Sequence, residues 1–125
     1  MRTSAQIATK MELLDSKNWP HAKAGWLVLR EYHIGRKKYE TSVLRDDLDN
    51  YIEDNWRILR EGTEQDATIA HVRVQTIIWL MGNDDLLEGL SRIPRSGERE
   101  GIKDRLEVIH NHYGIPIPES ESEEK

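Results

Sequence analysis

The chain has 125 residues and a formal net charge of −5, a length that fits one domain better than two independent cores. Hydrophobic residues make up 37% of the sequence and charged residues 33%, which favours solvated helices over a large two-layer enzyme. The absence of cysteine excludes disulfides, thiolate zinc sites, iron–sulfur clusters and cysteine nucleophiles. No apolar run reaches the roughly 18 residues of a membrane span, and Met1–Lys10 lacks the apolar core of a signal peptide, so we expect a cytoplasmic protein without membrane contact.

Charge is distributed unevenly along the chain, with a net +5 over residues 1–45, −6 over 46–66 and −4 over 67–125. Residues 119–125 contain only Glu, Ser and Lys, so they have no apolar side chain whose burial would offset the entropy of ordering. We therefore expect a single helical domain over residues 1–118, followed by a disordered acidic tail over 119–125.

The first expected helix runs from about Ser4 to Lys17. Thr3 and Gln6 have the spacing of a capping box at its start. Apolar side chains then recur with helical spacing at Ile7, Met11 and Leu14. The helix must end before Pro20, because proline disfavours the helical conformation of the residue that precedes it.

Residues 26–43 have two interpretations. A helix that begins at Pro20 places Trp26, Leu29 and His33 on one face. A strand that turns at Gly35 into a second strand would instead form a short β-hairpin. The strand faces do not separate into polar and apolar sides, and residues 22–31 are rich in helix formers, so the helix is favoured and the hairpin is the alternative.

A long third helix is predicted from an N-cap at Ser42 to Gly62, with a buried stripe at Leu44, Leu48, Tyr51, Ile52 and Leu59. Asp66 is the expected cap of a fourth helix. From Ile69 to Met81 this helix is apolar on nearly every side, which is typical of a central helix that its neighbours bury.

Two further helices complete the expected fold. Asn83 opens a short helix, and Ser96 is the expected cap of the last one. The sequence Tyr-Gly-Ile-Pro at 113–116 is a strong helix stop, because glycine takes the left-handed conformation readily and proline cannot continue the helix. The sequence thus predicts an all-α protein, an irregular bundle of five or six helices.

The sequence offers no specific catalytic or cofactor motif. Glu107 and His110 have the Glu-x-x-His spacing found in di-iron bundles, but no second copy exists, so we expect a solvated pair and no metal site. His71 lies among apolar residues and is expected to be a hydrogen-bonded core histidine. Asp46, Asp49 and Glu53 share one helix face, which leaves a magnesium-dependent nucleotide hydrolase as a third hypothesis for function.

A nucleic-acid-binding regulator is the second hypothesis. Trp26, Tyr32 and Tyr39 are interleaved with the basic residues of the segment 23–45, and cations contact phosphates while aromatic faces stack on bases. The expected contacts are Lys23, Arg30, Arg36, Lys37, Lys38 and Arg45.

The first hypothesis is a non-catalytic interaction protein, an adaptor, regulator or inhibitor that binds a protein partner. Four tryptophans in so small and polar a chain exceed what a small core easily hides, and tryptophan is a frequent interface anchor. Trp56 is the tryptophan most expected to be exposed, and the alternative is that all four pack within the bundle. Val72, Gln75 and Trp79 share one side of the fourth helix and are the expected contact row of a homodimer with twofold symmetry.

Overall fold

The computed structural model describes residues 1–93 and 97–118, and every regular element in them is a helix. The helices are α1 (Ser4–Asp15), α2 (Pro20–His33), α3 (Thr41–Glu61), α4 (Glu64–Leu80), α5 (Asp84–Ser91) and α6 (Glu98–Tyr113). The predicted all-α bundle is confirmed, and α2 replaces the alternative hairpin. The expected tail at 119–125 and the expected cap at Ser96 lie outside the described residues.

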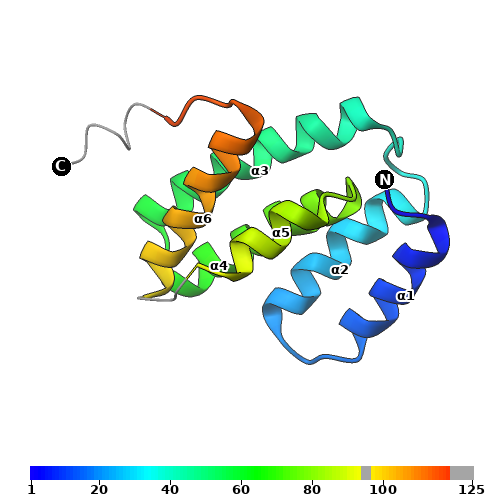
Figure 1. Ribbon diagram of the computed structural model, residues 1–125. Helices are drawn as coiled ribbons and strands as arrows, with labels where there is room; N and C mark the ends of the chain where they lie inside the picture. The colour runs from blue at the N-terminus through cyan, green and yellow to red at the C-terminus, as the bar shows by residue number, and fades with distance from the viewer. Residues whose placement is uncertain (94–96, 119–125) are drawn as a thin grey trace.

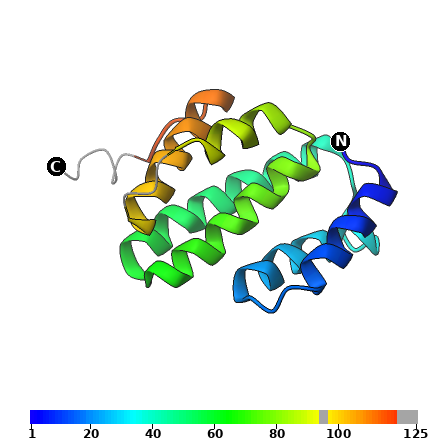
Figure 2. The same cartoon turned by 60° about the horizontal axis from the view of Figure 1, so that its bottom comes forward.

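The central position of α4 organises the bundle. It packs against α2, α3, α5 and α6, while α1 packs on α2. Figures 1 and 2 show the antiparallel α3–α4 pair between the α1–α2 hairpin on one side and α5 with α6 on the other. A single apolar core draws buried side chains from all six helices. The prediction of a central helix covered by its neighbours is therefore confirmed.

Side-chain capping bonds mark the start of α1, α4 and α5. The capping box of α1 is present, because Thr3 Oγ1 accepts a hydrogen bond from the Gln6 amide at 3.1 Å and Gln6 Oε1 accepts one from the Thr3 amide at 2.8 Å. The cap of α4 is Thr63, whose hydroxyl accepts from the Asp66 amide at 3.0 Å. The prediction of Asp66 as the cap was wrong by three residues, since its carboxylate is the reciprocal partner of a second capping box.

The start of α3 differs from its prediction, whereas the end of α6 agrees with it. The N-cap of α3 is Glu40, two residues before the predicted Ser42, and it makes no side-chain capping bond. The helix stop after α6 is confirmed: Gly114 is left-handed with φ of 68°, and the Ile115 amide donates to the His110 carbonyl at 2.9 Å.

Trp56 is buried, with 1% of its surface exposed, so the prediction that it is the exposed tryptophan was wrong. It lies four residues after Ile52 and therefore continues the buried stripe of α3. Its Nε1–H donates to Nε2 of His110 at 2.8 Å. His110 is itself 2% exposed. The prediction that Glu107 and His110 form a solvated pair is therefore wrong, because His110 is buried.

This burial predicts a large difference between two tryptophans. Trp56→Ala should lower the free energy of unfolding by about 3–5 kcal/mol, because it leaves a cavity and an unpaired histidine nitrogen. Trp19→Ala, at a side chain that is 51% exposed, should cost less than about 1 kcal/mol. Urea denaturation of the two variants measures both values. Equal losses would contradict the assignment of Trp56 to the core.

Candidate functional site

Two adjoining hollows lie along one side of α4, and we refer to them together as the α4 groove. Their volumes are about 530 and 260 Å³, and both are lined by Val72, Gln75 and Leu87. The α4 groove extends from Thr68 to Trp79, which is about 16 Å of helix at a rise of about 1.5 Å per residue. That length matches about five residues of an extended peptide.

Three of the four residues predicted to bind a partner line this groove. Val72, Gln75 and Trp79 are each partly exposed on α4, as their shared helix face requires. Lys10 and Leu14 of α1 also line the groove. The fourth predicted residue, Trp56, lies in the core, so the structure does not bring it to the groove.

A glycine brings one wall of the groove close to its floor. A Cβ atom at Gly25 of α2 would lie 3.3 Å from Thr76 Oγ1, 3.4 Å from Leu14 Cδ1 and 3.5 Å from Val72 Cγ1. The first distance is tighter than nine in ten real Cβ contacts, so the absence of a side chain at residue 25 helps α2 to approach α4 this closely.

The Trp79 end of the groove is cationic. The Arg2 guanidinium lies 4.6 Å and the Lys10 ammonium 5.5 Å from the centroid of the Trp79 ring. Arg2 also donates through Nε to the Trp79 carbonyl at 2.8 Å and forms an ion pair with Asp84. Lys10 lines the groove, so a positive charge stands beside its apolar floor.

At the opposite end, a buried amide fixes the state of His71. Asn55 donates through Nδ2 to the Ala67 carbonyl at 3.2 Å, so its Oδ1 faces Nδ1 of His71 at 3.0 Å. An oxygen can only accept, so Nδ1 carries the histidine proton. In the neutral ring, Nε2 is then a bare acceptor. It is buried and has no hydrogen-bond partner among residues 1–93 and 97–118.

Burial and charge both keep the His71 ring neutral. Burial, followed by the positive charge of Arg105, lowers the pKa of His71 from 6.5 to about 3. Arg105 is 8% exposed and donates through Nε to the Leu90 carbonyl at 3.2 Å. Both side chains line the groove, so this end combines an unpaired acceptor with a buried cation.

Sequence reasoning found His71 but missed Asn55 and Arg105. The prediction of a core histidine with a hydrogen bond is confirmed. Asn55 follows Leu48 by seven residues and Arg105 follows Ile102 by three, so both interrupt apolar helix faces. A polar residue on a buried face is the signal that would have identified them.

A second pocket, of about 500 Å³, lies between α3 and the segment after α6, but its buried polar groups are satisfied. Nε2 of His110 accepts from Trp56, and Nδ1 lies 3.2 Å from the Ile115 carbonyl, to which it donates. Burial lowers the pKa of His110, which keeps the imidazole ring uncharged. We therefore consider the α4 groove the stronger candidate.

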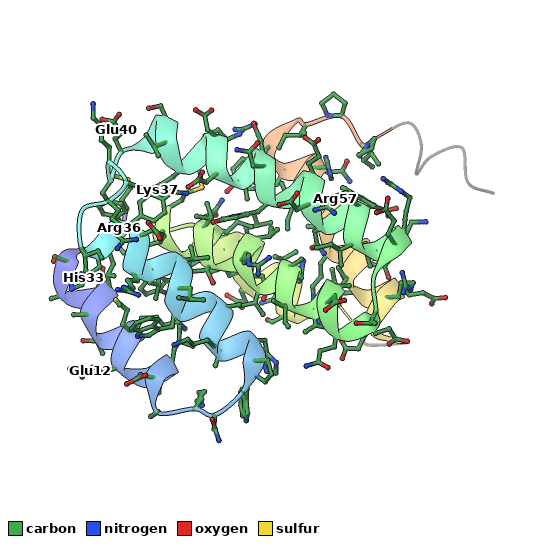
Figure 3. The ribbon with its side chains drawn as sticks, turned by 180° about the vertical axis from the view of Figure 1, so that it is seen from behind. Glu12, His33, Arg36, Lys37, Glu40 and Arg57 are labelled. Atoms are coloured by element: carbon green, nitrogen blue, oxygen red, sulfur yellow. The ribbon has the colours of Figure 1, made fainter. Side chains whose placement is uncertain are left out.

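The basic residues considered for nucleic-acid binding are dispersed. Lys23 and Arg30 lie on α2, at 4.6 and 5.7 Å from the centroid of the Trp26 ring. Figure 3 shows Arg36 and Lys37 in the connection between α2 and α3, far from Arg57, which lies near the other end of α3.

Carboxylates pair with several of these cations. Arg36 lies 4.0 Å from Glu31, and Lys37 lies 2.7 Å from Asp47. Arg45 lies 3.4 Å from Asp49.

Arg45 contacts a different helix. Its guanidinium stacks 5.1 Å from the ring centroid of Tyr113 of α6, whereas Asp47, two residues further on, turns toward α2. Lys38 is exposed. Three of the six predicted residues thus have a carboxylate within 4.0 Å, which reduces the positive charge that they can present.

The acidic residues of α3 do not form a metal site with their neighbours. Asp47 accepts hydrogen bonds from the Tyr32 hydroxyl and from Lys37. Within residues 1–93 and 97–118, no group of three His, Asp or Glu side chains is arranged to hold a metal ion. The magnesium hypothesis therefore gains no support.

Comparisons with protein-family models, curated proteins and solved structures give no significant match. In the part of the chain that the structure describes, no helix has the length and hydropathy needed to cross a membrane. The groove is therefore interpreted from its own geometry.

The buried His71 predicts a pH dependence of stability. The folded ring stays neutral down to about pH 3, whereas the unfolded ring takes up a proton near pH 6.5, so acid stabilises the unfolded state. Between pH 7 and pH 5 the wild type should lose about 2 kcal/mol more of its free energy of unfolding than His71→Gln does. Urea denaturation at both pH values measures this. His110 is present in both proteins and cancels, and equal losses would contradict the lowered pKa.

Proposed function

We propose that this protein is a non-catalytic interaction protein that binds a segment of a protein partner in the α4 groove. The observation that carries the proposal is the gathering of Val72, Gln75 and Trp79 in one groove. A concave, partly apolar site with a few polar groups is the usual form of a binding site.

The recessed position of this row favours an inserted segment over direct contact between two copies of α4. Residues of α1, α2 and α5 line the groove beside the row, among them Leu14, Gly25 and Leu87. To reach the row, a second copy of α4 would have to fit its whole helix between these neighbouring helices. A short extended segment needs much less space, and the groove is about 16 Å long.

Charge indicates the character of that segment. Lys10 and Arg105 line opposite ends of the groove, against one lining carboxylate, Glu98. An acidic segment with apolar side chains complements this arrangement. Nucleic acid is a weaker fit, because the cations of the segment 23–45 are dispersed. A steep loss of affinity with added salt would indicate phosphate contacts instead.

Site-specific photo-crosslinking tests the groove as the binding site. We expect p-benzoylphenylalanine in place of Gln75 to give a discrete adduct in cell extract. Leu87→Arg in the same chain should abolish the adduct, because the long charged side chain enters the middle of the groove. The matched control carries the probe at Lys103, on the exposed face of α6, and should give no adduct.

Two outcomes would contradict the proposal. One is the absence of any adduct from the Gln75 probe. The other is an adduct that persists unchanged in Leu87→Arg while the far-ultraviolet circular dichroism shows the helices intact. An adduct of twice the chain mass would identify the partner as a second copy.

Self-association is tested separately by sedimentation equilibrium. If the protein forms a homodimer through the predicted row, Trp79→Ala should weaken the dimer by about 2 kcal/mol or more, the usual threshold of an interface hot spot. A species of 14.6 kDa that persists at high micromolar concentration would end the homodimer hypothesis and leave a different protein as the partner.

A further inference from the structure

Arg2 joins three helices at the Trp79 end of the groove. Its backbone N–H donates to the Leu80 carbonyl at 3.0 Å and its Nε–H to the Trp79 carbonyl at 2.8 Å, so it binds the last turn of α4. Its guanidinium also forms an ion pair with Asp84, in the first turn of α5. Arg2 directly precedes Thr3, the N-cap of α1. Figure 2 accordingly shows the start of the chain beside the turn from α4 to α5.

The contacts of Arg2 suit the end of a helix. The last carbonyls of a helix lack helical partners, and the helix dipole places partial negative charge there. The Tyr39 hydroxyl donates to the Arg2 carbonyl at 2.7 Å and lies 3.1 Å from the Leu80 carbonyl. The side chain of Arg2 is 14% exposed, so solvent screens its contacts with α4 less than those of a surface cation.

Two walls of the groove begin at the helix starts that Arg2 joins. On one side, Ile7 is the single buried residue of α1, which packs on α2, and Lys10 follows it by one turn and lines the groove. On the other side, Leu87 lies one turn after Asp84 on α5 and also lines the groove. The position of α1 relative to α5 therefore depends strongly on the contacts of one residue.

We propose that Arg2 is a positioning residue of the groove, which sets the separation between α1 and α5 at the Trp79 end. The proposal rests on the groove being the partner site. Arg2 acts through the two helices that it joins to α4. Without its contacts, α1 is held chiefly by the packing of Ile7 and by its connection to α2, and the wall that carries Lys10 moves away from α4. Such a groove binds a short segment less tightly, because binding must then also order the wall.

A distance measurement across the groove tests the proposal directly. The chain has no cysteine, so spin labels on cysteines introduced at Glu12 of α1 and Glu88 of α5, both exposed, report one distance by double electron–electron resonance. We expect a narrow distance distribution when Arg2 is present. Arg2→Gln should broaden the distribution and move its mean to longer distances by several ångström, while the far-ultraviolet circular dichroism stays unchanged.

Matched variants separate the role of Arg2 from a general effect of charge. Arg36→Gln removes the same group from a side chain that is 64% exposed and should leave the distribution unchanged. Asp84→Asn removes only the ion pair with α5, so it should broaden the distribution less than Arg2→Gln does. The readout at the partner site is the adduct of the Gln75 probe, whose yield should fall severalfold in Arg2→Gln and stay constant in Arg36→Gln.

Three results would overturn the inference. One is an unchanged distance distribution in Arg2→Gln, even if the protein becomes less stable. The second is a broadened distribution with a full yield of the Gln75 adduct, since the position of the wall would then not affect binding. If Arg2→Gln does not fold, Asp84→Asn decides, and an unchanged distribution in that variant is the third. A missing adduct in the protein with Arg2 intact would instead refute the proposed function, and the distance measurement would still decide whether Arg2 positions the walls.

Discussion

The burial of α4 is the constraint on which the rest of the structure depends. A helix that is apolar on nearly every side must be covered on nearly every side, and α4 therefore contacts four other helices. A chain of 125 residues has little material to spare for this purpose. The cover is complete over Val74, Ile77 and Ile78, which have no exposed surface. It is incomplete over the row that includes Gln75, and this incomplete cover is the groove.

Buried contacts between helices orient the polar groups at one end of the groove. Asn55, on α3, orients His71, on α4. Burial, together with the positive charge of Arg105 on α6, keeps that histidine neutral, so three helices determine the state of one nitrogen atom. The other buried histidine, His110, shows the contrast. Both of its nitrogens have partners, and it serves to join Trp56 to the end of α6. Similar burial thus gives one histidine a packing role and leaves the other with an unfilled acceptor.

Most of the fold follows from local sequence signals, whereas the groove does not. The apolar surface of α4 and the stop at Gly114 are properties of short segments, and both predictions were confirmed. The errors arose where a local rule was applied too narrowly, as for Trp56, which is four residues beyond Ile52 on the same helix face. The groove joins Lys10, Gly25, Gln75, Leu87 and Arg105, and no periodicity relates positions so far apart. Only the packing of the helices brings them together.

The weak attachment of α1 has a consequence for how the groove opens. Ile7 is the single buried residue of α1, which packs on α2, although Lys10 and Leu14 form part of the groove wall. Elements with few buried contacts unfold locally at a small cost in free energy while the remainder stays folded. The backbone amides of α1 should therefore exchange with solvent faster than those of α4. An occupant of the groove that contacts Leu14 would slow this exchange, so the exchange rates of the α1 amides would report whether the groove is occupied.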